Sequence, residues 1–191
     1  ILLVLWCVTG VKLAAMKVES LDRGWFFNRG YESQAADKVT VDLPHTWNAA
    51  DAMFGNVNYY RGMSTYSRFI VVPSSENFKR VFLRVKAAQT VADVYLDNHF
   101  VAQHKGGYTS FTVELTHLIR RGEKQKLDIR VSNAQTMEIA PICGDFNIWG
   151  GLNRGVELLY TDDACIDPTF YGSSGVFFTQ CDVSEKYAGL E

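Results

Sequence analysis

Apolar and polar side chains alternate in short runs along much of this chain. In residues 79–86, Val81, Leu83 and Val85 fall on one side, and residues 125–131 repeat the same alternation. A period of two over this length is typical of a strand with one buried face. We therefore expect both segments to be half-buried β-strands.

Turn-forming residues separate several other β-rich runs. The run at 66–72 stops at Pro73, which cannot donate to a strand ladder. The pair Asp97-Asn98 lies between two runs and suits a two-residue hairpin turn. We expect further strands at 66–72, 91–96, 99–103, 111–115 and 155–161.

The spacing of these runs predicts the fold class. They recur roughly every 8–15 residues, and no long stretch has the period of a helix. Residues 116–121 would form at most one short helical turn. The pattern therefore predicts an all-β fold of the sandwich or barrel type.

The first residues differ from the rest. Residues 1–11 are almost unbroken apolar sequence, shorter than the about 20 residues that span a bilayer. They resemble the apolar region of a secretory signal, and Ala14 and Ala15 would suit cleavage. We expect residues 1–15 to be a partial signal peptide of a secreted or periplasmic protein with no membrane span. The alternative is a hydrophobic first strand.

Composition narrows the class of function. The chain has 191 residues, is 47% hydrophobic and carries a net charge of −2, so it offers one sizeable core and no basic footprint for a nucleic acid. Its histidines and cysteines lack paired ligand spacing, so we expect no metal and no cofactor. Cys143, Cys165 and Cys181 are interpreted as buried or half-buried free thiols, with a Cys143–Cys165 bridge as the alternative.

Catalytic motifs are missing from the sequence. It has no Gly-x-Ser-x-Gly elbow, no phosphate-binding glycine loop and no His-Glu-x-x-His pair. On the residues alone, the chain is a secreted all-β domain of the binding-module type.

Five segments carry a more specific signal. They occur in the order Asp42-Leu-Pro-His-Thr-Trp47, Tyr59-Tyr-Arg-Gly62, Thr90–Leu96, Gly106–Phe111 and Ala140–Glu157. Together they resemble the N-terminal sugar-binding domain of family 2 glycoside hydrolases, the β-galactosidase and β-glucuronidase type. The resemblance runs from about Leu21 to Gln180.

This resemblance implies a domain order. Residues 21–170 would form a jelly-roll sandwich of the galactose-binding type, and residues 171–191 would be a linker and the start of an Ig-like domain. In such enzymes a (β/α)8 barrel follows and carries both catalytic glutamates, about 5 Å apart in a retaining mechanism. The chain itself lacks these glutamates. Its expected partners are a carbohydrate, as a β-glycoside, and the Ig-like and barrel domains of a longer parent.

The resemblance also implies site residues. Asp145 precedes Arg154 by nine positions, like an acidic residue that holds a sugar hydroxyl in related β-galactosidases. This context favours a β-galactosidase parent. Asn147, and Asn58 with its neighbour Asn56, are further candidates for sugar binding. The alternative for each is a local turn or cap, in which Asp and Asn are common.

Other residues of these motifs suggest structural roles. Arg154 lies between apolar neighbours and would tie a loop to the sandwich, and Gly150 and Gly151 would allow close backbone approach or positive φ. His45 and Trp47 would pack against neighbouring domains. The aromatic ring of Trp149 suits either sugar stacking or an interface.

Two other functions fit the same fold. The chain would be a free-standing carbohydrate-binding module, or a scaffold sandwich whose loops touch no sugar. The sequence continues beyond the expected last strand through Tyr171–Phe178, which resembles the family's linker and favours the glycosidase parent.

Overall fold

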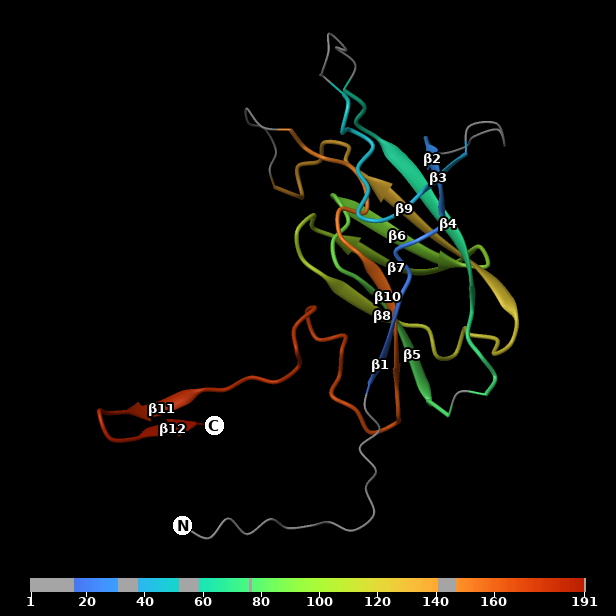
Figure 1. The fold of residues 1–191 in the computed structure, drawn as a ribbon. Helices are drawn as coiled ribbons and strands as arrows, with labels where there is room; N and C mark the ends of the chain where they lie inside the picture. Colours follow the sequence, from blue (N-terminus) through green and yellow to red (C-terminus); the bar gives the residue numbers. More distant parts are fainter. Residues whose placement is uncertain (1–15, 31–37, 52–58, 76, 141–146, 191) are drawn as a thin grey trace.

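The computed structural model describes residues 16–30, 38–51, 59–75, 77–140 and 147–190, of which residues 188–190 are described by their backbone alone. Two antiparallel sheets face each other across one core (Figure 1). The four-stranded sheet has the order β1 (Lys17–Ser20), β10 (Val156–Thr161), β5 (Arg80–Val85) and β8 (Phe111–Glu114). The predicted jelly-roll sandwich is therefore confirmed.

The second sheet has six strands. Their order is β3 (Val39–Val41), β2 (Trp25–Arg29), β4 (Met63–Val71), β9 (Lys124–Ser132), β6 (Val91–Leu96) and β7 (His99–Lys105). A separate two-stranded sheet, β11 (Gln180–Val183) with β12 (Ala188–Leu190), follows near the end of the chain. The described residues contain no helix, and so none that is long and apolar enough to cross a membrane.

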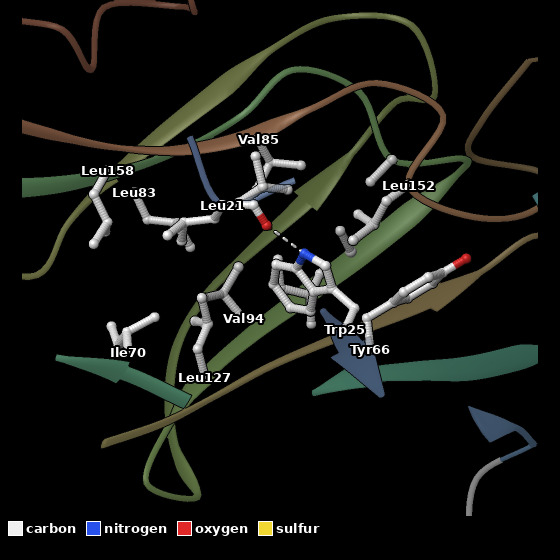
Figure 2. Packing of buried hydrophobic residues seen from close by; sticks show 14 of the residues in the cluster. Leu21, Trp25, Tyr66, Ile70, Leu83, Val85, Val94, Leu127, Leu152 and Leu158 are labelled. Atoms are coloured by element: carbon white, nitrogen blue, oxygen red, sulfur yellow. Dashed lines mark hydrogen bonds between the residues drawn. The ribbon is translucent and has the colours of Figure 1, made fainter. Parts of the chain in front are cut away.

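Alternating side chains from both sheets fill the core (Figure 2). Val81, Leu83 and Val85 point inward, as their period of two predicts, and the indole of Trp25 lies among them. The Trp25 Nε1 donates to the Leu21 carbonyl oxygen over 2.6 Å, so the buried indole keeps a hydrogen-bond partner.

The predicted hairpin is present between β6 and β7. Asp97 and Asn98 have φ values of 48° and 67°, the left-handed pair that a type I′ turn requires. Residues 116–121 begin with one hydrogen-bonded turn, in which Leu118 and Ile119 both donate to the Leu115 carbonyl oxygen, as in a single helical turn. No helix continues from it, and the chain then turns into β9.

Strand β5 departs from the prediction of one buried face. Phe82 lies on the face away from the core, yet it is fully buried, as is Leu159 of the adjacent β10. Residues after β10 lie over this outer face, where they line a cavity with Arg84 and Thr112, so the centre of the sheet, at Phe82 and Leu159, is buried on both faces. The cysteines also differ in part, since Cys165 is half-buried but Cys181 is exposed; both are free, and Cys143 lies outside the described residues.

Candidate functional site

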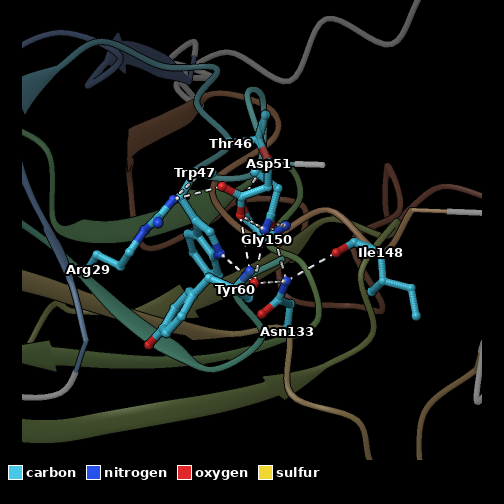
Figure 3. Close-up of polar contacts among 9 residues, drawn as sticks. Arg29, Thr46, Trp47, Asp51, Tyr60, Asn133, Ile148 and Gly150 are labelled. Carbon is cyan, nitrogen blue, oxygen red and sulfur yellow. Dashed lines mark hydrogen bonds and ion pairs between the residues drawn. The ribbon is translucent and has the colours of Figure 1, made fainter. Parts of the chain in front are cut away.

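Four connections meet at one end of the sandwich (Figure 3). Residues 45–51 follow β3, residues 59–62 lead into β4, Asn133 follows β9, and residues 148–151 precede β10. Strands β4 and β9 are antiparallel, with Met63 opposite Ser132, so the start of one lies beside the end of the other. The fold therefore gathers three of the recognised sequence motifs in one place.

Two buried asparagines connect these segments. The Asn48 Nδ2 donates to the Asp51 carboxylate over 2.8 Å and to the Tyr60 carbonyl oxygen over 2.9 Å. Its Oδ1 accepts from the Gly150 amide over 2.8 Å. The Asn133 Nδ2 donates to the Ile148 carbonyl oxygen over 3.0 Å. Both asparagines are fully buried. Their side-chain amides supply the hydrogen bonds that the buried backbone groups of these loops need, as neighbouring strands do within a sheet.

The carboxylate of Asp51 holds the next part of the network. Its Oδ2 accepts from the Tyr60 amide over 3.1 Å, and its Oδ1 lies 3.5 Å from the Arg29 guanidinium. Arg29 also donates to the Trp47 carbonyl oxygen over 2.6 Å. The buried carboxylate is thus hydrogen-bonded and paired with a cation, as a buried charge requires.

Tyr59 joins two distant loops directly. Its hydroxyl donates to the Ile148 carbonyl oxygen over 2.7 Å, and burial is the main cause that raises the pKa of this phenol. Tyr59 follows residues 52–58 in sequence, and Ile148 closely follows residues 141–146. The hydrogen bond therefore fixes the points where both segments rejoin the described fold.

Gly150 and Gly151 permit close packing in the same place. A Cβ atom on Gly150 would lie 2.0 Å from Cζ2 of the Trp47 indole. Gly151 has a φ of +136°, and a Cβ there would lie 2.4 Å from the His45 carbonyl oxygen. Both positions exclude a side chain, one by contact with an indole and the other also by its backbone conformation.

An open cavity of about 470 Å³ lies beside the network and is lined in part by His45, Trp149 and Asn153. Trp149 is 37% exposed. Burial lowers the pKa of the His45 imidazole, whose Nδ1 lies 2.7 Å from the Tyr66 hydroxyl. A neutral imidazole and an exposed indole make this cavity suited to an uncharged or apolar contact.

Of the predicted sugar-binding residues, the structure describes Asn147. Asp145 and Asn58, with Asn56, lie outside the described residues. Asn147 is described and exposed beside Ile148. Among the described residues, the structure brings together Tyr59 and Ile148, which flank the predicted site in sequence.

Arg154 and Trp47 differ in their surroundings from what the sequence suggested. Arg154 is exposed, and within the described ranges it has no hydrogen bond or ion pair, although its neighbours Leu152 and Val156 are buried. Trp47 was expected to face another domain, but it packs inside this one, against Gly150 and stacked on Phe27.

Sequence reasoning missed Asn48, Asp51 and Asn133. Asn48 directly follows the Pro-His-x-Trp motif, and that adjacency was the available signal. Asn133 had none, because an asparagine after a strand is ordinarily a turn residue. In the part of the chain that is described, no group of three or more His, Cys, Asp or Glu side chains could hold a metal ion.

The two sheets define a jelly-roll β-sandwich domain. Residues 18–162 match the family described as glycosyl hydrolases family 2, sugar binding domain. The chain belongs to this family, which confirms the resemblance drawn from its motifs.

Proteins with similar sequences support this family membership. A β-glucuronidase of Bacteroides fragilis is 40% identical over 168 residues, covering 88% of this chain and 24% of that protein. A β-galactosidase of Thermoanaerobacter pseudethanolicus is 30% identical, covering 69% of this chain and 18% of that protein. The chain thus spans about a quarter or less of the length of these relatives.

A solved structure shows the same fold. Bacteroides uniformis β-glucuronidase 2, covalently bound to cyclophellitol-6-carboxylate aziridine, matches with a TM-score of 0.82 and 33% sequence identity. The match covers 92% of this chain and 21% of that one.

Proposed function

We propose that this chain is the N-terminal domain of a secreted glycoside hydrolase, where it supports a catalytic barrel and presents two loops to the sugar. The Tyr59–Ile148 hydrogen bond is the observation that carries this proposal, because it joins the flanks of the segments that hold Asn58 and Asp145. Asn147 lies exposed beside the same point.

The proposed role of Asp145 follows from its chemistry. An ionised carboxylate accepts hydrogen bonds from several sugar hydroxyls, and charge-assisted hydrogen bonds are the stronger kind. Anchored flanks would hold such a carboxylate in place before the sugar arrives, which lowers the entropy lost on binding. Bond cleavage itself is assigned to the barrel of the parent, so the isolated chain is expected to hydrolyse no aryl β-glycoside.

The sugar class follows from the relatives. Both the relative with 40% identity and the solved structure with 33% identity are β-glucuronidases. They support a β-glucuronide as substrate of the parent over the β-galactoside suggested by the Asp145 context. Rates of the parent on 4-nitrophenyl β-glucuronide and β-galactoside distinguish the two.

The test of the domain's role is Asp145→Asn in a parent enzyme that carries this chain. Loss of a hydrogen bond to a charged group, worth about 1.5–3 kcal/mol, would lower kcat/KM roughly ten- to a hundredfold with the melting temperature unchanged. Asp163→Asn removes an exposed carboxylate elsewhere in the described chain and serves as the matched control. A lower melting temperature with kcat/KM intact would instead make Asp145 a loop cap.

Secretion is a separate part of the proposal and rests on the apolar residues 1–11. Expression of the natural gene followed by fractionation tests it. Protein found with an intact residue 1–15 segment inside the cell would contradict it.

A further inference from the structure

The chain after β10 folds back over the outer face of the four-stranded sheet. Ser110 donates to the Gly172 carbonyl oxygen over 3.1 Å, and the Arg80 guanidinium donates to the Cys165 sulfur over 3.4 Å. These two contacts hold residues 162–175 above the sheet. Between this covering segment (residues 162–175) and the sheet lies a cavity of about 620 Å³.

A row of cross-strand neighbours brings charge to the cavity. Glu157 lies opposite Arg84, and Arg84 lies opposite Thr112. The Glu157 carboxylate is shared by two cations, with Arg84 Nε at 3.2 Å and Lys86 Nζ at 2.8 Å. Two cations therefore share one carboxylate, and Arg84 is the one of them that lines the cavity.

The guanidinium of Arg84 is only partly used by this pairing. Arg84 lines the cavity, and its ion pair with Glu157 runs through Nε, which is buried without a hydrogen bond; within the described ranges no hydrogen bond holds its guanidinium. A guanidinium whose terminal N–H groups are not hydrogen-bonded is suited to donate two parallel hydrogen bonds to a carboxylate.

Two threonines add hydroxyl groups to the same cavity. Thr112 and Thr161 line it, and both residues are buried. The Thr161 Oγ1 is buried without a hydrogen-bond partner among the described residues. An unpaired buried hydroxyl is costly, so a polar ligand atom near Thr161 would be stabilised by it. Thr161 lies opposite Arg80, whereas Thr112 lies directly opposite Arg84 and is the threonine beside its guanidinium.

The remaining wall is largely apolar. Ala164, Ile166 and Pro168 of the covering segment face the cavity, and Met16 closes one side. Cavities of about 300–1,000 Å³ with apolar walls and a few convergent polar groups are typical of small-molecule sites. A small inorganic anion would leave these apolar side chains in contact with nothing, and a neutral apolar molecule would leave the cation without a partner.

We infer that this cavity binds a small organic acid, with its carboxylate on the Arg84 guanidinium and the Thr112 hydroxyl and its apolar body against the covering segment. The site is separate from the loop network and belongs to no part of the proposed function. It would make the sandwich a second ligand-binding unit of its own.

Titration calorimetry of the full chain with 3-phenylpropanoate tests this inference. The matched probes are 3-phenylpropanamide, which keeps the shape without the charge, and acetate, which keeps the charge without the apolar body. We expect the acid to bind and each of the other two probes to bind at least tenfold more weakly. Equal binding of the amide, or no binding of the acid, would overturn the inference.

Variants connect the binding to the cavity. Arg84→Gln is expected to weaken binding of 3-phenylpropanoate at least tenfold, whereas Arg23→Gln, the same charge loss at an exposed arginine, leaves it unchanged. Should Arg84→Gln unfold because Glu157 loses a partner, Ala164→Phe fills the cavity from the covering segment with the sheet untouched. Undiminished binding by a folded Ala164→Phe chain would place the ligand elsewhere and overturn the site.

Discussion

The hydroxyl of Tyr59 donates to the carbonyl oxygen of Ile148 over 2.7 Å and joins residues 89 positions apart. This is a direct side-chain link between two loops that Asn48 and Asn133 also connect. The strength of this link can be measured by removing a single oxygen atom.

Tyr59→Phe removes the hydroxyl and keeps the ring. We expect a loss of about 1 kcal/mol, the net worth of an ordinary hydrogen bond, and a fall in Tm of about 2–4 °C. Tyr171→Phe is the matched control, because Tyr171 is 89% exposed. Thermal unfolding followed by circular dichroism compares the two, and an equal small effect would mean that the Tyr59 bond contributes nothing.

The side chain of Asn48 connects three parts of the network, at Asp51, Tyr60 and Gly150. Asn48→Ala leaves the Asp51 carboxylate and the Gly150 amide each short of a buried partner. We expect a loss of about 2–3 kcal/mol in the free energy of unfolding. Urea denaturation measures it, with the exposed Asn147→Ala as control. A cost below that of the control would show that water replaces the amide without penalty.

Gly150→Ala tests packing against Trp47. Its Cβ would lie 2.0 Å from the indole, so either the loop or the ring must move. We expect a larger fall in Tm than for Gly24→Ala, because a Cβ on Gly24 meets no atom within 4 Å although its φ is +74°. Gly24→Ala therefore measures backbone strain alone, of about 1–2 kcal/mol. If Trp47→Leu fails to restore part of the loss in Gly150→Ala, the clash is not its cause.

The pair of Arg80 and Glu114 gives stability that depends on pH. Hydrogen bonds from the Arg80 guanidinium, at 3.0 Å and 2.8 Å, lower the pKa of Glu114 to about 2 from the usual 4.5. Because the pKa is lower in the folded state, the contribution is full above about pH 5 and is lost as the pH falls toward 2.

Glu114→Gln should therefore lower Tm by about 2–4 °C at pH 7, as expected for a partly exposed pair worth about 1 kcal/mol. The difference from the natural chain should shrink steadily as the pH falls below 5. Arg80→Gln should give the same trend, since it removes the other half of the pair. A difference that stays constant down to pH 3 would contradict this origin.

Local sequence pattern predicted the strands that alternate clearly and missed those that do not. Strand β6 was expected at 91–96 and lies there, because Ala92, Val94 and Leu96 all face the core. Strand β2 was missed because three aromatic residues in a row hide its period. Trp25 and Phe27 point inward there, while Phe26 faces outward and is 44% exposed.

The candidate site could be predicted only where a motif marks it. The Pro-His-x-Trp and Gly-Gly segments indicated which loops matter. The partners of Asn133 could not be found from sequence, because its bonds reach residues 15, 72 and 85 positions away. Long-range side-chain hydrogen bonds leave no local period. The buried outer face of Phe82 was missed for the same reason, since its cover comes from the far end of the chain.

The pairing of β1 with β10 has a consequence for synthesis of the protein. The Tyr160 hydroxyl donates to the Glu19 carboxylate, so one of the first strands meets its partner 141 positions later. At about 5–20 residues per second, the ribosome needs roughly 7–30 s to make that stretch. During that time β1 is an unpaired edge outside the ribosome, and the four-stranded sheet closes only as its last strand emerges.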